Sequence, residues 1–251
     1  MKKILCIGNS FSQDATHFLH QIGEAAGVES KVVNLCIGGC SLERHYKTIT
    51  NEIADYEYEL NGVWDGEFTT LSKVLAEEEW DIITIQQASH ESGWLDAYEP
   101  FAGHILAYLK EKAPNAKIML HQTWAYAKVC NHPNYPRYNC NQQEMYQKVI
   151  HAYTTISEKY GIPMIPNGRL VQKLRETEVF SEENGTAAIC RDGFHMSYVY
   201  GRYAVACMFA KVMFGIKLEG NTYIPQTTYA PDFVSDAQIL AMIRKTVDEF
   251  E

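Results

Sequence analysis

The chain has 251 residues, of which 46% are hydrophobic and 21% are charged, and its formal net charge is −9. This composition is ordinary for a globular protein, and the length suits one α/β domain with a sizeable core. Nucleic acids and anionic membranes require a basic face on their protein partner, so the negative charge argues against both as partners.

The N-terminal segment shows no pattern of a secretory signal. Met1-Lys2-Lys3 leads directly into a strand of a few apolar residues, and no apolar run reaches the length of a membrane span. The seven cysteines are odd in number and include no C-x-x-C pair, which indicates reduced thiols. We therefore expect a cytoplasmic protein, unless a signal has already been removed from the chain.

Short apolar runs alternate with segments of helical spacing along the chain. The runs predict strands over residues 4–7, 31–37, 80–87, 117–123 and 161–166. Apolar residues at helical spacing predict helices from about residue 12 to 26 and over about 41–54, 71–75, 98–112, 145–160, 170–176, 197–214 and 235–250. Residues 55–68 are aromatic, polar and interrupted by glycines, so we expect a loop or a small hairpin there. The alternation predicts a doubly wound α/β/α sandwich in a single domain over residues 1–251.

The stretch Gly8-Asn9-Ser10-Phe11-Ser12 places a serine just beyond the carboxyl end of the first predicted strand. Ligands bind at this edge in open α/β sheets. A serine there can be a nucleophile, with the N–H groups of a helix start beside it to hold an oxyanion. The alternative interpretation is that Ser10 or Ser12 only caps the following helix.

Two further loop segments carry residues of the same chemistry. Gly38-Gly39 ends the second predicted strand and permits a tight turn with close approach of a ligand. Late in the chain, Asp192 and His195 are three residues apart before a helix, so the carboxylate can fix the tautomer of an imidazole that points into the cleft. Each feature is weak alone, but three at three loop positions together indicate a catalytic site.

The third predicted strand ends unusually, in the two amides Gln86 and Gln87. Buried amides must be hydrogen-bonded, so an organised polar arrangement is expected there. Residues 127–140 form a long loop rich in Asn, Pro, Tyr and Cys, and loops of this length are often functional.

In their order, these motifs resemble the sequence blocks of the SGNH (GDSL-like) hydrolases. The stretch around Ser10 resembles the first block, with Asn9 where Gly-Asp-Ser members have Asp. Gly39 resembles the second-block glycine, and the stretch Asp192-Gly193-Phe194-His195 resembles the D-x-x-H fifth block. The third block departs, because Gln86-Gln87-Ala88-Ser89-His90 stands where most members have Gly-x-Asn-Asp. Gln87 is a candidate for the missing side-chain donor, whereas Ser89 holds the nominal position of the family's Asn.

The resemblance spans most of residues 1–215. A further segment supports membership of a branch with a Gly-Asn-Ser-Phe first block, namely His121-Gln122-Thr123-Trp124-Ala125-Tyr126. It implies a flavodoxin-like fold, with a five-stranded parallel sheet and helices on both sides.

Two functions compete on this basis. In a serine esterase, His195 takes the proton of Ser10, Asp192 orients His195, and the N–H groups of Ser10 and Gly39 hold the oxyanion with Gln87. The alternative is a non-catalytic carbohydrate-binding or scaffold protein on the same fold. A metal-dependent hydrolase is disfavoured, because the candidate histidines do not show H-E-x-x-H or comparable spacing. These histidines are His17, His20, His90, His121 and His132. We therefore expect neither a metal nor another cofactor.

The expected substrate is a small-molecule or oligosaccharide ester with a short acyl group, most simply acetyl on a carbohydrate. Part of this expectation is implied by the resemblance, since relatives of this kind often deacetylate sugars. Trp124 and Tyr126 follow the fourth predicted strand, and aromatic faces with polar tips suit a sugar ring. We predict these two residues, together with Ser89, as substrate-binding. The alternative is that Trp124 and Tyr126 pack under the 127–140 loop.

Overall fold

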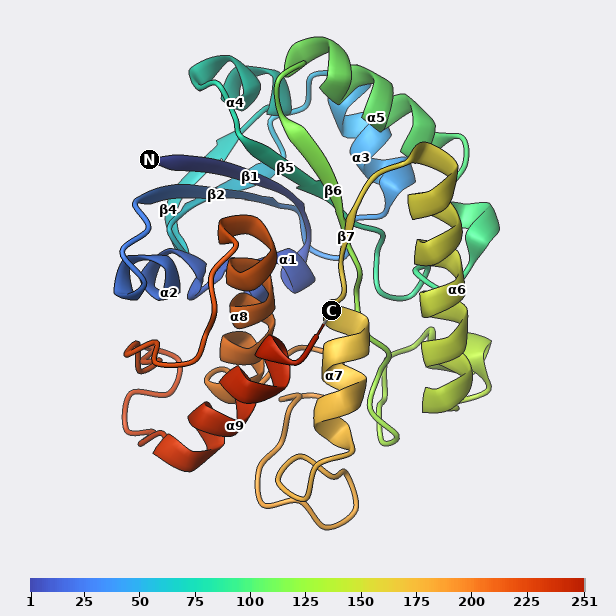
Figure 1. Cartoon of the computed structure of the whole chain (residues 1–251). Helices are drawn as coiled ribbons and strands as arrows, with labels where there is room; N and C mark the ends of the chain where they lie inside the picture. The colour runs from blue at the N-terminus through green and yellow to red at the C-terminus, as the bar shows by residue number, and fades with distance from the viewer. Residues whose placement is uncertain (251) are drawn as a thin grey trace.

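The computed structural model describes residues 1–250, in which a twisted sheet lies between two layers of helices (Figure 1). The strands are β1 (Lys2–Gly8), β2 (Ser30–Cys36), β3 (Tyr56–Leu60), β4 (Val63–Thr69), β5 (Ile82–Ile85), β6 (Lys117–His121) and β7 (Met164–Ile165). Their order in the sheet is β4-β3-β2-β1-β5-β6-β7. Five neighbouring strands of this order are mutually parallel, namely β2, β1, β5, β6 and β7. They form the predicted five-stranded parallel core.

Two strands extend the sheet beyond the five that were predicted. Residues 55–68 adopt the hairpin of the two alternatives, and β3 pairs antiparallel with both β2 and β4. The turn Asn61-Gly62 has positive φ at both residues, 53° and 85°, as tight hairpins require. A Cβ on Gly62 would lie 2.3 Å from the carbonyl oxygen of His17, so only glycine allows the hairpin tip to pack there.

The helices are α1 (Ser10–Thr16), α2 (Leu19–Ala25), α3 (Leu42–Thr50), α4 (Leu71–Glu77), α5 (Phe101–Lys112), α6 (Gln142–Tyr160), α7 (Asn167–Arg175), α8 (Tyr200–Phe214) and α9 (Ala237–Asp248). Short 3₁₀ turns cover Leu95–Ala97 and Tyr135–Tyr138. The single helix predicted from residue 12 to 26 is two helices, and the break between them is where the hairpin tip packs on His17. Within residues 1–250, no helix is both long and apolar enough for a bilayer crossing.

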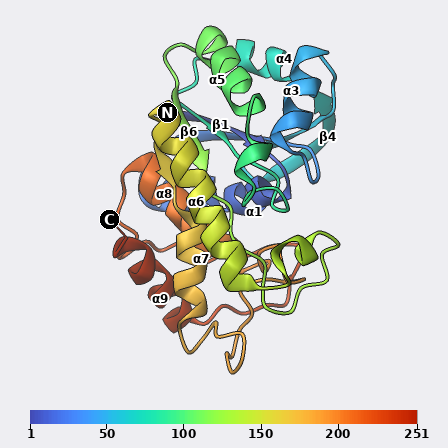
Figure 2. The same cartoon turned by 90° about the vertical axis from the view of Figure 1, so that its right-hand side faces the viewer.

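The two helix layers cover opposite faces of the sheet. Helices α3, α4 and α5 lie on one face, and α1, α2 and α8 lie on the other, as two views at right angles show (Figures 1 and 2). Strand β1 is central and its residues Ile4, Leu5 and Cys6 are fully buried, which explains its unbroken apolar run. Helix α8 is buried on nearly its whole circumference and packs against α1, α2, α7 and α9.

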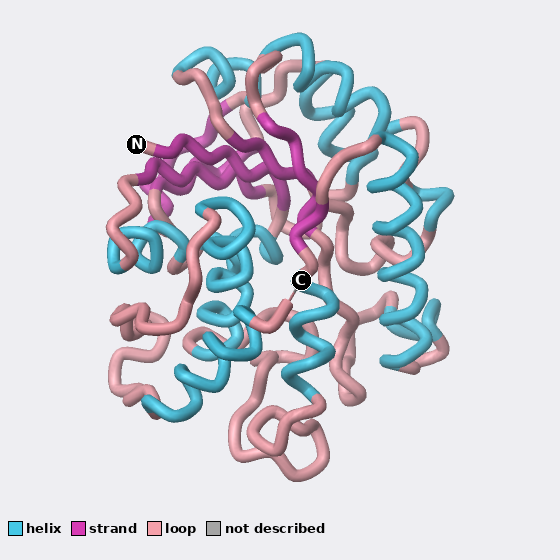
Figure 3. The backbone as a smooth tube through the Cα atoms, in the orientation of Figure 1, coloured by secondary structure: helices cyan, strands magenta, loops and turns pink. Residues whose placement is uncertain are grey.

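The long segment between α7 and α8 has no helix or strand over residues 176–199 and forms the large loop at the bottom of Figure 3. Its last part carries Asp192 and His195. A single bridge between Cys190 and Met196 closes this part into a short turn. The helix predicted over about residues 197–214 is α8, which begins three residues later than expected, at Tyr200.

Candidate active site

Helix α1 begins directly at the carboxyl end of β1 and carries Ser10 as its first residue. The helix cap is Asn9, whose Oδ1 accepts a hydrogen bond of 3.0 Å from the N–H of Phe11. The capping role proposed as an alternative for Ser10 therefore belongs to Asn9. The hydroxyl of Ser10 is left to contact the loop of residues 190–196.

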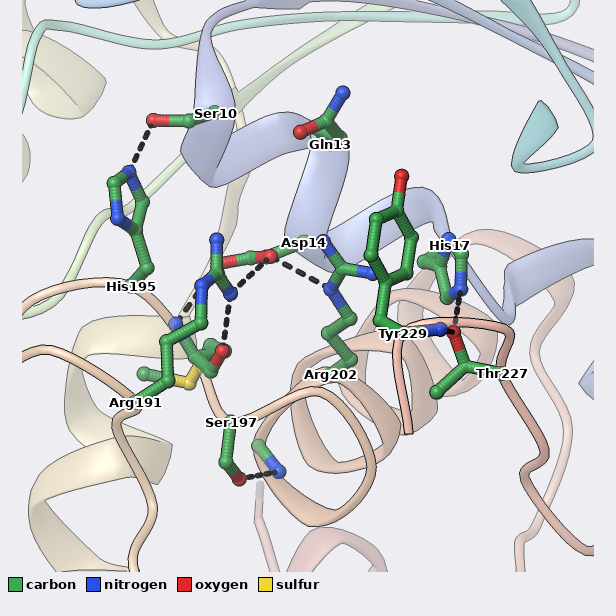
Figure 4. A network of polar contacts seen from close by, with 12 residues as sticks. Ser10, Gln13, Asp14, His17, Arg191, His195, Ser197, Arg202, Thr227 and Tyr229 are labelled. Atoms are coloured by element: carbon green, nitrogen blue, oxygen red, sulfur yellow. Dashed lines mark hydrogen bonds and ion pairs between the residues drawn. The ribbon is translucent and has the colours of Figure 1, made fainter. Parts of the chain in front are cut away.

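The structure brings Ser10, His195 and Asp192 together in one hydrogen-bonded row. Figure 4 shows the contact between Ser10 and His195. His195 Nε2 lies 2.9 Å from Ser10 Oγ, and His195 Nδ1 lies 2.6 Å from Asp192 Oδ2. The other carboxylate oxygen of Asp192 accepts from the N–H groups of Phe194 at 3.1 Å and His195 at 2.8 Å. This arrangement holds the proton of His195 on Nδ1 and leaves Nε2 free to accept one from Ser10.

The electrostatics of Asp192 suit this position. Partial burial alone would raise the pKa of Asp192, but the hydrogen bonds from His195 and Phe194 outweigh it, and the pKa lies below its usual range. The carboxylate is therefore ionised at neutral pH, where it stabilises an imidazolium that forms on His195.

The loop of residues 190–196 is held in place from the β6 side. Trp124 Nε1 donates to the carbonyl of Phe194 at 2.7 Å, and the N–H of Ala127 donates to the carbonyl of Gly193 at 2.7 Å. Gly193 has a φ of +89°, and a Cβ there would lie 2.8 Å from the carbonyl oxygen of Val129. The tight Asp-Gly turn thus depends on glycine for both its conformation and its close packing.

A buried carboxylate ties the same loop to helix α1. Asp14 lies one helical turn beyond Ser10 and is fully buried. It accepts from the N–H of Met196 at 2.8 Å, from Arg191 at 2.9 Å and from Arg202 Nε at 2.8 Å (Figure 4). Sequence reasoning missed these three charged residues, although an aspartate on the same helix face as Ser10 is a usable signal. Asp14 connects the element that carries the serine with the loop that carries the histidine.

Two backbone N–H groups beside Ser10 are suited to bind an oxyanion. Gly39 lies in the exposed turn after β2, with a φ of +62°, and Ser10 follows the adjacent parallel strand β1. Within residues 1–250, neither the N–H of Ser10 nor that of Gly39 donates a hydrogen bond. Both are therefore available for a ligand at this sheet edge.

The structure does not support the prediction that Gln87 completes the oxyanion hole. The side chain is fully buried, and its Oε1 accepts from the N–H groups of Leu42 at 2.9 Å and Ala88 at 2.8 Å. Its Nε2 donates to the carbonyl of Ala97 at 2.9 Å. Gln87 therefore joins the loop after β5 to the start of α3. Ser89 is half-buried and its Oγ lies 2.9 Å from the hydroxyl of Tyr126.

A substitution separates these two roles of Gln87. Gln87→Met keeps the volume but leaves three backbone groups without their partner, so we expect a loss of about 2–4 kcal/mol in the free energy of unfolding. Turnover should stay within about threefold of wild type, because no reacting atom is touched. Urea unfolding and ester hydrolysis measure the two effects. A loss of about a hundredfold in kcat at unchanged stability would restore the oxyanion role.

The predicted sugar-stacking faces of Trp124 and Tyr126 are not accessible. Both side chains are 0% exposed. Trp124 stacks on Phe11 with ring centroids 4.1 Å apart, and Tyr126 packs against Tyr135 and Phe194. Tyr126 thus packs under the 127–140 loop, as the alternative supposed. Trp124 is covered instead by Phe11 of α1 and by the loop of residues 190–196.

A different set of rings extends from His195. Phe194 lies 4.2 Å from His195 between ring centroids, His132 lies 5.0 Å from Phe194, and His90 stacks on His132 at 5.8 Å. His90 and His132 are partly exposed, and burial lowers the pKa of both, so they are neutral at pH 7. We call Phe194, His132 and His90 the ring row. The sequence contained a sign of the ring row, because His90 and His132 both lie in predicted loops, but they were considered only as metal ligands. Residues 1–250 contain no group of three side chains placed to hold a metal ion.

Solved structures share this architecture. A protein from Slackia heliotrinireducens, proposed to be an SGNH hydrolase, superimposes with a TM-score of 0.58 at 22% identity, over 84% of this chain and 98% of that one. Axe2, an acetylxylan esterase from Geobacillus stearothermophilus, superimposes with a TM-score of 0.54 at 16% identity, over 90% of this chain and 97% of that one. At these identities the likeness shows the fold, which is the three-layer α/β fold of the SGNH hydrolases.

The family follows from closer matches. The model of the family described as "Domain of unknown function (DUF4886)" matches residues 3–238. A DUF4886 family protein from Bacteroides uniformis is 35% identical and superimposes with a TM-score of 0.86, over 98% of this chain and 93% of that one. The chain belongs to the DUF4886 family. A comparison with curated proteins found no match.

Proposed function

We propose that the protein is a serine ester hydrolase that removes short acyl groups, chiefly acetyl, from carbohydrates. The observation that supports it most is the row of hydrogen bonds from Asp192 through His195 to Ser10. A non-catalytic carbohydrate-binding or scaffold protein has no need to hold a serine, a histidine and a carboxylate in this order.

In the proposed reaction, Ser10 Oγ attacks the ester carbonyl carbon while His195 Nε2 takes the hydroxyl proton. The negative charge that develops on the carbonyl oxygen is held by the N–H groups of Ser10 and Gly39. The tetrahedral intermediate collapses, His195 returns the proton to the leaving alcohol, and an acyl-serine remains. Water, deprotonated by His195, then attacks the acyl carbon, and the carboxylic acid leaves as Ser10 recovers its proton.

The ring row supports a carbohydrate as the alcohol part of the substrate. Neutral imidazoles donate with one nitrogen and accept with the other, as sugar hydroxyls require. His132 Nδ1 accepts from the N–H of Asn134 at 3.2 Å, so its Nε2 carries the proton and is a donor. The side chain of His90 has no hydrogen bond to another described residue and is partly exposed. The fold neighbour Axe2 is an acetylxylan esterase, which motivates the choice of acetylated xylo-oligosaccharides as test substrates.

The proposed function is tested by labelling and by turnover together. A fluorophosphonate should modify Ser10 alone, as peptide mapping shows. Acetate should be released from p-nitrophenyl acetate and from acetylated xylo-oligosaccharides, and p-nitrophenyl octanoate should be slower than the acetate. Absence of labelling at Ser10 would contradict the serine hydrolase. Labelling with faster octanoate turnover, or without acetate release from any sugar, would contradict only the substrate.

The ring row gives a prediction of its own. His90→Ala removes one hydrogen-bonding partner of a sugar hydroxyl, which is worth about 0.5–1.5 kcal/mol, so KM for acetylated xylo-oligosaccharides should rise about three- to tenfold. Hydrolysis of p-nitrophenyl acetate should change by less than about twofold, because that substrate has no sugar. His151, exposed on α6, provides the matched control His151→Ala, which should change neither. Equal losses on both substrates would place His90 outside sugar binding.

A further inference from the structure

One buried amide joins the loops that follow three neighbouring strands. Asn9, 2% exposed, lies between β1 and α1. Its Oδ1 accepts from the N–H of Phe11 at 3.0 Å and from Gln86 Nε2 at 2.8 Å, and its Nδ2 donates to the carbonyl of Cys40 at 3.0 Å. Gln86 follows β5 and Cys40 lies in the loop after β2, so a single side chain fixes three loops to one another.

The two proposed oxyanion donors are the chain neighbours of this contact. Ser10 follows Asn9, and Gly39 precedes Cys40. An oxyanion hole works only when both N–H groups lie about 3 Å from the same point. The backbone bond from the N–H of Ile37 to the carbonyl of Gly8, 3.1 Å long, joins the two strand ends, and the bond from Asn9 to the carbonyl of Cys40 joins the loops beyond them. The Asn9 bond therefore helps to set the separation of the two donors.

The orientation of the Asn9 amide is determined by buried hydrogen bonds that run through His121 to Gln86. His121 is fully buried, and burial lowers its pKa to about 3, so its ring is neutral and carries one proton. Its Nδ1 lies 2.7 Å from Gln86 Oε1, and its Nε2 lies 3.2 Å from Asn167 Nδ2, which can only donate. The proton of His121 is therefore on Nδ1. Hydrogen bonds run in one direction, from Asn167 through His121 and Gln86 to Asn9 and the carbonyl of Cys40.

We propose that Asn9 is a positioning residue that sets the spacing of the oxyanion donors Ser10 and Gly39, with its amide oriented by the chain Gln86–His121–Asn167. The inference rests on the proposed ester hydrolase function. It also explains why asparagine stands where the Gly-Asp-Ser pattern has aspartate. A carboxylate at position 9 has only acceptors, and its second oxygen would face the carbonyl oxygen of Cys40 at about the hydrogen-bond distance without a proton between them.

The test is the nearly isosteric change Asn9→Asp, assayed on p-nitrophenyl acetate between pH 6 and 9. At pH 9 the variant should lose about 10- to 100-fold in kcat, less than the 10²–10³ seen when a donor is deleted, with KM within about threefold. Burial raises the pKa of the new carboxyl, and a protonated carboxyl can donate to Cys40. The ratio of variant to wild-type kcat should therefore rise as the pH falls, and taking this ratio cancels the pH dependence that the two enzymes share.

The chain offers a matched control in Asn221. This residue is also buried, accepts from the N–H of Tyr223 two residues on at 3.1 Å, and donates to the carbonyl of Ile22 at 3.0 Å. Asn221→Asp makes the same chemical change away from the triad. It should lower the melting temperature about as much as Asn9→Asp does, without changing kcat or the pH dependence of the ratio.

A second variant covers the case in which Asn9→Asp fails to fold. Asn9→Ser keeps a helix-capping hydroxyl but is too short to reach Cys40, so kcat should fall about tenfold or more with no recovery at low pH. Retention of more than a third of wild-type kcat by the folded variants would overturn the inference, as would an equal kcat loss in Asn221→Asp. If wild-type enzyme is not labelled at Ser10 by a fluorophosphonate, the proposed function fails first, which separates the two failures.

Discussion

Ser10→Ala should abolish ester hydrolysis while leaving the fold intact. In the proposed mechanism, Ser10 forms the acyl-enzyme bond, and removal of a triad serine in other enzymes costs about 10⁶ in kcat. The hydroxyl is partly exposed and its hydrogen bond is to His195, so we expect the free energy of unfolding to change by less than about 0.5 kcal/mol. Single-turnover assays and urea unfolding measure the two quantities.

The matched control for this variant is Ser12→Ala on the same helix. Ser12 is buried, and its Oγ donates to the carbonyl of Asn9 at 2.8 Å. Loss of this bond should cost about 1 kcal/mol of stability and less than about tenfold in turnover. The two serines thus have opposite expected effects. If Ser10→Ala keeps more than a tenth of the wild-type rate, another group is the nucleophile.

Local patterns predicted the parallel core of the fold correctly because they report burial directly. The run Ile4-Leu5-Cys6-Ile7 lies buried on both faces of the sheet, and such strands leave an unbroken apolar stretch. The hairpin over residues 55–68 was only one of two alternatives. Whether it joins the sheet depends on the edge of β2 and on His17, which lie far away in the sequence.

The site was predictable where a motif is short and local, and unpredictable where distant loops decide. Asp192 and His195 are on one turn, so their contact follows from their spacing. Trp124 follows a strand end, where an aromatic side chain is either exposed or covered, and it is covered by Phe11 of α1 and by the distant loop of residues 190–196. Gln86 and Gln87 are adjacent amides that face different partners, Asn9 and the start of α3. No local pattern tells which of two neighbouring amides faces the site.

The buried ion pairs of Asp14 fix the loop of residues 190–196 to helix α1. Asp14 pairs with both Arg191 and Arg202, and it also accepts from the backbone of Met196. Removing one member of a buried ionic group leaves an uncompensated charge, which is costly. The contact between His195 and Ser10 therefore depends on charges that do not take part in the proposed reaction.

His195→Ala should be nearly as damaging as Ser10→Ala, with a loss of about 10⁵–10⁶ in kcat, because the two residues act as one unit. For the same reason the double variant should be little slower than either single variant. Wild-type activity should fall at acid pH, because a protonated His195 cannot accept the proton of Ser10. The residual activity of His195→Ala should not show this fall at acid pH.

Chemical rescue gives the sharpest measurement of this prediction. Imidazole added to His195→Ala can occupy the space of the lost ring and accept the proton of Ser10, so part of the rate should return as imidazole is raised. Ser10→Ala offers imidazole no hydroxyl to deprotonate and should not respond. The ionised Asp192, whose pKa is held below its usual range, remains in place to orient the added base. A wild-type rate that is flat from about pH 5 to 8, or rescue that is equal in both variants, would contradict the assignment of His195 as the base.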